Sequence, residues 1–311
     1  MFDYSAKQKA AIVDGRQKRN ALIRATKDVV RKAMSPDELR GTFKLDTILS
    51  GSTGIGKTYN IVKELEASGA EYFVLQGSQS MFAFATRLML EHHLFQAKKK
   101  KNPELQKLII LVDDCDSFFT NKDSLNNLKG MTGKEGSRWF QYNKAIQEHM
   151  MTPEMLTILD NYRNPNGAQG FKVNCDDIIF ILTTNTPLPS ENHANNYVKK
   201  HGPTSRGARL LDLAAIRRRF NTKDFILSKE INWGWIAEVT LNDGLIDNIF
   251  KDNTLNQRKQ FILDWMWNNW SHMMEHNIDT VYDLALHMHE SPTEFRDIWE
   301  ADYIDAELAV A

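Results

Sequence analysis

Residues 51–58 read Gly51-Ser52-Thr53-Gly54-Ile55-Gly56-Lys57-Thr58 and fit the pattern G-x-x-x-x-G-K-[ST] of a phosphate-binding loop. Glycines let the backbone N–H groups turn inward and cradle the phosphates of a nucleotide. Lys57 would reach the β- and γ-phosphates, and the Thr58 hydroxyl would hold Mg²⁺. All eight residues are therefore candidate nucleotide-binding residues.

The flanking sequence supports this interpretation. An apolar stretch over residues 43–49 predicts a strand before the loop, and residues 59–65 have the spacing of a helix after it. A helix that begins near Lys57 would add its N-terminal dipole to phosphate binding. A simple turn rich in Gly, Ser and Thr would not account for the Gly-Lys-Thr ending.

Bulk properties narrow the class of protein. The chain has 311 residues, 42% of them apolar and 25% charged, which predicts a globular protein of two domains. Its net charge of −1 means that any nucleic-acid or membrane contact must use a local patch. Two cysteines, no signal peptide and no long apolar run predict a cytoplasmic protein without membrane contact.

Composition divides the chain into three predicted parts. Residues 1–40 hold ten Lys/Arg and five Asp/Glu, a local charge of +5, with apolar residues at loose helical spacing. They predict a basic helical segment that packs on the nucleotide core, and a phosphate-backbone contact is the alternative. Residues 41–227 alternate strand-like and helical stretches, which predicts a parallel α/β domain, and residues 228–311 look helical.

The predicted core elements follow from apolar runs and their boundaries. After residues 43–49, strands are expected at residues 72–75, 108–112, 178–182 and 225–227, with a helix at 80–95 and a basic loop at 97–103. In the C-terminal part, helices are expected at 256–273, 280–289 and 294–308, the second capped by Asp279. The aromatic residues of these helices are expected to form their core.

Polar residues follow two of the buried strands. Asp113-Asp114 end the strand at 108–112, where an acid beside a phosphate-binding loop serves Mg²⁺ chemistry. Asp113 would help to hold Mg²⁺, and Asp114 would orient and polarise the attacking water. The strand at 178–182 runs into Thr183, Thr184 and Asn185, and Asn185 could position the same water. Further on, residues 217–219 are three arginines. They could form a solvated helix face, or they could project into the active site of a neighbouring subunit.

This order of elements resembles the AAA+ ATPase family over roughly residues 40–290. The resemblance implies a P-loop NTPase fold, a three-layer αβα core with a parallel sheet, followed by a C-terminal helical lid. It also implies that Asn185 is the sensor-1 residue. Arg219 is the best candidate for the arginine finger and Arg218 the second, with Arg206 and Arg209 behind them.

A finer similarity points to one branch of that family. Residues 156–163, 167–173 and 178–185 are similar to the segment before sensor 1 in Clp-type ATPases, where a leucine-rich helix, a Gly-rich turn and a β-hairpin lead into the sensor strand. This implies the branch with a hairpin inserted before sensor 1. The branch includes protein unfoldases as well as DNA-remodelling and metal-insertion ATPases.

The sequence departs from the family pattern at several positions. Asp114 stands where the family usually has Glu, so its carboxylate is one methylene further from the water. Tyr282 stands near the expected sensor-2 arginine, and Arg296 comes later than expected. Residues 81–84, Met-Phe-Ala-Phe, lack the glycine of an unfoldase pore loop.

The resemblance implies Mg²⁺-dependent hydrolysis of ATP to ADP and phosphate by a homo-oligomeric ring or spiral, most often of six subunits. Three hypotheses remain for what it acts on. The basic N-terminal segment and the lysines at 98–101 favour a nucleic-acid motor in replication, recombination or helicase loading, with DNA as substrate. The similarity at 156–185 favours a protein unfoldase or remodeller, and Asp114 favours a slow ATP-dependent switch or scaffold.

Overall fold

The computed structural model of the chain describes residues 4–35, 44–76, 79–105, 107–120, 122–132, 138–165 and 168–305. These residues form two compact units. The first contains residues 1–24, 51–57 and 225–311, and the second contains residues 25–50 and 58–224. The long helix α1 (Ala6–Ala33) contributes residues to both.

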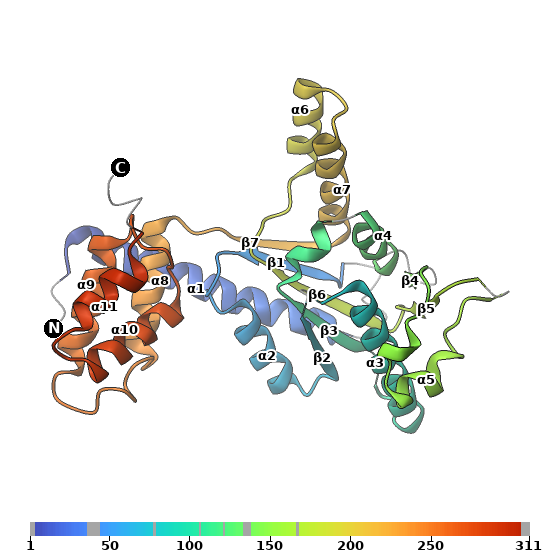
Figure 1. The fold of residues 1–311 in the computed structure, drawn as a ribbon, viewed down its shortest axis with the longest axis horizontal. Helices are drawn as coiled ribbons and strands as arrows, with labels where there is room; N and C mark the ends of the chain where they lie inside the picture. Colours follow the sequence, from blue (N-terminus) through green and yellow to red (C-terminus); the bar gives the residue numbers. More distant parts are fainter. Residues whose placement is uncertain are drawn as a thin grey trace. The chain divides into compact units, whose positions relative to one another are not determined.

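The first unit is helical. Besides the beginning of α1 it contains α8 (Lys229–Asn242), α9 (Leu255–Asn269), α10 (Ile278–Glu290) and α11 (Phe295–Tyr303) (Figure 1). Trp233, Trp299 and the apolar face of α10 form its buried core, as expected for the aromatic residues of this region. The N-cap of α10 is Asn277 rather than Asp279, because the Asn277 side chain accepts a hydrogen bond from Thr280 N at 2.8 Å.

α1 packs closely on α8 inside this unit. A Cβ added to Gly15 would lie 2.3 Å from the backbone of Gly234, so a side chain at this crossing would force the two helices apart. Next to the crossing, Arg16 forms two hydrogen bonds of 2.9 Å with the buried carboxylate of Glu238. This part of the basic N-terminal segment therefore packs on the C-terminal helices.

The second unit contains the mostly parallel α/β sheet that the sequence predicts. The five strands are ordered β2-β3-β6-β1-β7, and the β1–β6, β2–β3 and β3–β6 pairs are parallel (Figure 1). Their bounds are β1 Thr47–Gly51, β2 Tyr72–Gln76, β3 Leu108–Asp113, β6 Ile178–Thr184 and β7 Asn221–Phe225. The strand expected at 225–227 thus lies earlier, at 221–225.

Helices and a small second sheet complete this unit. They are α2 (Lys57–Ser68), α3 (Met81–Lys101), α4 (Lys122–Met131), α5 (Pro153–Leu159), α6 (Glu191–His201) and α7 (Ser205–Arg219), with 3₁₀ helices at Cys115–Phe119 and Glu148–Met150. Strands β3 and β6 are buried on both faces, and one face packs against α3 and α4. In Figure 1 the α6–α7 pair extends away from the sheet.

One local expectation was wrong. The lysine run at 98–101 is not a loop but the last turn of α3, whose C-cap is Asn102. Before β6, Arg163 and Phe171 form an antiparallel bridge across the glycine-rich turn, and β5 (Phe171–Asn174) pairs antiparallel with β4 (Trp139–Tyr142), some thirty residues earlier.

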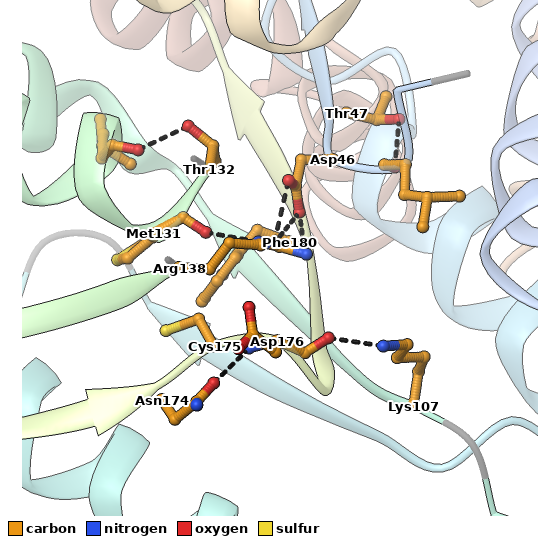
Figure 2. A network of polar contacts seen from close by, with 12 residues as sticks. Asp46, Thr47, Lys107, Met131, Thr132, Arg138, Asn174, Cys175, Asp176 and Phe180 are labelled. Atoms are coloured by element: carbon orange, nitrogen blue, oxygen red, sulfur yellow. Dashed lines mark hydrogen bonds and ion pairs between the residues drawn. The ribbon is translucent and has the colours of Figure 1, made fainter. Parts of the chain in front are cut away.

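A buried ion pair ties these pieces to the sheet. The Arg138 guanidinium donates two hydrogen bonds, of 2.9 and 3.0 Å, to the Asp46 carboxylate (Figure 2). Asp46 also accepts a hydrogen bond from Phe180 N in β6, and Arg138 Nε donates to the Met131 carbonyl that ends α4. Residues that precede β1, end α4 and form β6 therefore meet at one polar contact.

Candidate active site

The phosphate-binding loop connects the end of β1 to the start of α2, as predicted. Gly54 and Gly56 have φ angles of +70° and +75°, the left-handed region that glycine adopts without a Cβ penalty. The Lys57 ammonium is buried and donates hydrogen bonds of 3.0 Å to the carbonyls of Gly51 and Ser52. The lysine therefore lies over the loop, where a phosphate group would meet it.

Residues of the helical unit brace this loop. Ser52 N donates to the Phe225 carbonyl at 3.3 Å. A Cβ on Gly54 would lie 2.5 Å from the Cβ of Asn277, the N-cap of α10. Side chains larger than hydrogen are therefore excluded at Gly54 on two independent grounds, its φ angle and the contact with Asn277.

Thr58 follows Lys57 in the chain, and its contacts lie in the second unit. Its hydroxyl hydrogen-bonds to Asp113 Oδ1 at the end of β3. The same oxygen accepts a hydrogen bond of 2.5 Å from the Thr183 hydroxyl in β6. The structure thus brings together two of the predicted residues, Thr58 and Asp113, and adds Thr183, which the sequence analysis did not single out.

The oxygens of Thr58 and Asp113 are the kind of ligand that Mg²⁺ prefers. Among the described residues no group of three or more His, Cys, Asp and Glu could hold a metal ion by itself. The donor set fits a cation held by one hydroxyl and one carboxylate, with water and phosphate oxygens as its other ligands, as Mg²⁺ is held beside nucleotides.

Asp114 has a backbone conformation that no other non-glycine residue of the described chain shares. Its φ and ψ angles are 51° and 52°, in the left-handed region, and its N–H donates to Thr183 Oγ1 at 3.1 Å. Such a conformation costs on the order of 1 kcal/mol outside glycine, least for Asn and Asp, and is found preferentially at functional sites. It turns the chain sharply after β3 and leaves the Asp114 side chain exposed.

Asn185 lies beside Asp114. Its Nδ2 is 3.5 Å from Asp114 Oδ1. Asp116 holds the neighbouring backbone: its carboxylate accepts hydrogen bonds from Asn185 N at 3.0 Å and from the Thr184 hydroxyl at 2.8 Å. Burial acts to raise the pKa of Asp116, but these hydrogen bonds outweigh it and lower the pKa below the ordinary 3.8.

Asp116 was not among the residues predicted from the sequence. The residue follows Asp113-Asp114 by two positions and reads as one more acid in a turn. Its partners come from β6, about seventy positions later in the chain. Only its nearness to the two acids was a signal.

The arginine segment divides into one anchored and two less constrained side chains. Arg217 donates to the Leu188 carbonyl at 2.7 Å and pairs with Asp224 at 2.6 Å. Arg218 is exposed, 3.8 Å from Glu191. Within the described part of the chain, the Arg219 side chain has no hydrogen-bond or ion-pair partner. Arg218 and Arg219 are therefore less constrained within the described part of the chain than Arg217, and their role as arginine finger stays a prediction.

Other candidates have structural roles. Arg296 stacks on the Phe261 ring, 4.9 Å from its centroid, and Arg209 donates to the Phe119 carbonyl. Phe82 and Phe84 are buried in the core beneath α3. The segment at 81–84 is therefore the first turn of a core helix and does not present a pore loop.

Comparison with known proteins agrees with this geometry. Residues 47–196 match the sequence model of the family described as "ATPase family associated with various cellular activities (AAA)". The matched range contains the phosphate-binding loop, the end of β3 and the end of β6. The comparison with curated proteins found no match. Across the residues that the structure describes, no helix is both long and apolar enough to cross a lipid bilayer.

Proposed function

Because the chain contains an ATPase domain of the AAA family, we propose that it is an ATP-driven motor that remodels or translocates a macromolecule. Binding and hydrolysis of ATP are general properties of that family, and its members commonly form oligomers. Here the motor works as a ring or spiral, of six subunits as is most common, with nucleic acid as its favoured substrate. Residues 1–40, 41–227 and 228–311 are the proposed N-terminal segment, core and lid.

One observation carries this proposal most directly. A continuous set of hydrogen bonds joins Thr58, Asp113, Thr183 and Asp114 at the carboxyl ends of β3 and β6, and Asn185 stands next to Asp114. In the proposed roles, the loop at 51–58 binds the phosphates of ATP, and Thr58 and Asp113 hold Mg²⁺. Mg²⁺, when bound, neutralises negative charge on the phosphates. Asp114 and Asn185 orient the attacking water.

Hydrolysis variants test these roles. Lys57→Ala is expected to abolish ATP binding or hydrolysis, and Asp114→Asn to retain binding while turnover stops. Nucleotide affinity is measured with a fluorescent ATP analogue, and turnover by phosphate release. If Asp114→Asn hydrolyses ATP at the wild-type rate, Asp114 is not the water-orienting residue.

The arginine finger is tested by mixing subunits. Arg219→Ala is expected to lower turnover by roughly 10³-fold with ATP affinity nearly intact, since a guanidinium stabilises transition-state charge. Doping this variant into wild type should poison the assembly more than in proportion to its fraction. Arg218→Ala is assayed in parallel, and the variant that poisons identifies the finger. If activity falls only in proportion to the fraction of variant subunits for both Arg218→Ala and Arg219→Ala, neither arginine acts on a neighbouring subunit.

Nucleic acid is favoured because the lysines that end α3 include two exposed side chains without acidic partners among the described residues. The test is ATP hydrolysis with and without single- and double-stranded DNA at two salt concentrations, because phosphate contacts release counterions. Absence of both stimulation and salt-sensitive binding would eliminate DNA as the substrate. Stimulation by an unfolded protein alone would favour the unfoldase.

A slow switch or scaffold is the second candidate. It is supported by Asp114, because the aspartate side chain is one methylene shorter than the usual glutamate and its backbone has left-handed φ and ψ angles. Steady-state turnover separates the two functions: a rate well above one per minute excludes the slow switch. Asp114→Glu provides the comparison, since it restores the reach of the usual side chain.

A further inference from the structure

A groove of about 710 Å³ lies between the last turns of α3 and the β4–β5 sheet. Its cationic lining residues are Lys100, Lys101, Arg163 and Lys172, and none of the described residues that line it is acidic. We propose that this α3–β4 groove binds single-stranded nucleic acid, with its cations on the phosphates and Trp139 against a base. This inference rests on the proposed function and assigns its substrate to a specific surface.

The lysine run at the end of α3 divides into two pairs. Lys98 forms an ion pair with Glu71, and Lys99 pairs with Asp177 at 2.9 Å. Lys100 and Lys101 are exposed, line the groove and have no acidic partner in the described part of the chain. Two of the four lysine charges are thus balanced inside the protein, and the other two are available to an anion.

The opposite wall carries a third available cation. Arg163 is already balanced by Glu148 and Asp160, at 2.7 and 2.9 Å. Lys172, by contrast, has no acidic partner in the described part of the chain, and its ammonium lies over one face of the Trp139 ring, 4.6 Å from the centroid. Lys100, Lys101 and Lys172 therefore place positive charge on both walls, as a groove that follows a phosphate backbone requires.

Trp139 decides between the classes of polyanion. Its ring is only partly buried and lines the groove, together with the amides of Asn161 and Asn174. A single strand presents unpaired base faces that stack on such a ring, whereas an acidic peptide would use the lysines alone. The volume falls within the roughly 300–1,000 Å³ of ligand sites, so the groove would hold a few nucleotides of a longer strand.

The assignment is tested by measuring how tightly the full chain binds a fluorescein-labelled oligothymidine. Fluorescence anisotropy gives the affinity at several salt concentrations between about 50 and 200 mM. Lys100→Ala/Lys101→Ala is expected to weaken binding at least roughly tenfold and to lower the slope of log K against log salt by about 1.4, two phosphates at about 0.7 each. Its basal ATP hydrolysis should stay at the wild-type level, and stimulation by the oligonucleotide should be lost.

The matched control is Lys199→Ala/Lys200→Ala. These two lysines are also adjacent, exposed and in the last turn of a helix, α6, so the variant changes the net charge equally. It is expected to bind within twofold of wild type. If both double variants weaken binding equally, or only the α6 variant does, the groove assignment is wrong.

Trp139→Ala is expected to weaken binding roughly 5- to 100-fold while the salt slope stays unchanged, because stacking releases no counterions. Trp139→Phe retains a ring and should keep most of the affinity, which separates stacking from misfolding. Tighter binding of a duplex, or equal binding of labelled polyglutamate, would overturn the assignment to a single strand. If wild type binds no nucleic acid, the proposed substrate fails as well; if it binds and the groove variants bind equally, only the groove is refuted.

Discussion

Replacing Arg138 by methionine would leave the Asp46 carboxylate buried without its counter-charge. Both side chains are at most one-tenth exposed, and two hydrogen bonds of 2.9 and 3.0 Å join them (Figure 2). Removing one partner of such a pair costs about 3–5 kcal/mol, because the remaining charge has lost its compensation in a low dielectric. The hydrogen bond from Phe180 N, at 2.9 Å, and the positive charge of Lys107 would still favour the ionised form of Asp46.

The cost should depend on pH in a defined direction. Burial raises the pKa of Asp46, and Arg138 offsets part of that rise. Without Arg138 the folded-state pKa rises further, so Arg138→Met loses stability as the pH rises from the unfolded-state pKa of about 3.9 to the folded-state value, by about 1.4 kcal/mol per pH unit. The variant is therefore expected to be less destabilised near pH 4 than at pH 8.

Hydrogen–deuterium exchange measures this unit separately from the helical one. Peptides that cover β6 should lose roughly two to three and a half orders of magnitude of protection, the equivalent of about 3–5 kcal/mol. Peptides from α8, in the other unit, serve as the internal control and should not change. The double variant Asp46→Asn/Arg138→Met removes both charges and keeps an acceptor for Phe180 N, so it should recover most of the protection. A pH-independent loss without recovery in the double variant would refute the reasoning.

Three further predictions concern the phosphate-binding loop, the partly buried His92 and Asp116. Gly54→Ala should weaken ATP binding at least roughly tenfold, because a Cβ there is strained by the positive φ angle and clashes with Asn277. Gly69 has a φ angle of +66° but open space around it, so Gly69→Ala should leave the affinity for ATP unchanged. Burial lowers the pKa of His92 to about 4, so the free energy of unfolding should fall by about 3 kcal/mol as the pH drops from 6.5 through 4. Urea titrations should show this decrease for wild type and not for His92→Gln. Asp116→Asn should lower kcat roughly 10- to 100-fold at unchanged ATP affinity, because the backbone N–H of Asn185, the proposed sensor-1 residue, loses an acceptor.

Local chemistry made the phosphate-binding loop and the strand ends predictable. Glycines at 54 and 56, a lysine at the helix start and acids after a continuous apolar strand each impose their structure within a few residues. The parallel sheet followed from the alternation of such segments. These features need no knowledge of distant partners, and the structure has them where they were expected.

Features that depend on residues far apart in the chain could not be predicted from the sequence. Arg138 and Asp46 are 92 positions apart, and the residues around each of them give no indication that they form an ion pair. β5 pairs with β4, some thirty residues earlier, and no residue near either strand in the sequence indicates that pairing. The lysine run was misread because Asn102-Pro103 signals a turn, whereas four lysines favour a helix and complement the negative end of its dipole.

The neighbouring acids Asp113 and Asp114 have identical side chains but different chemical positions. Asp113 Oδ1 accepts two hydroxyl hydrogen bonds, from Thr58 and Thr183, so its carboxylate is oriented before any cation binds. The left-handed backbone at Asp114 turns its side chain away from the strand, toward the amide of Asn185. A glutamate there would reach further from the same backbone. In the proposed site, the departure from the usual residue therefore changes the reach toward the attacking water and leaves Thr58 and Asp113, the proposed Mg²⁺ ligands, unchanged. Turnover, rather than ATP affinity, is the measurement that decides between motor and switch.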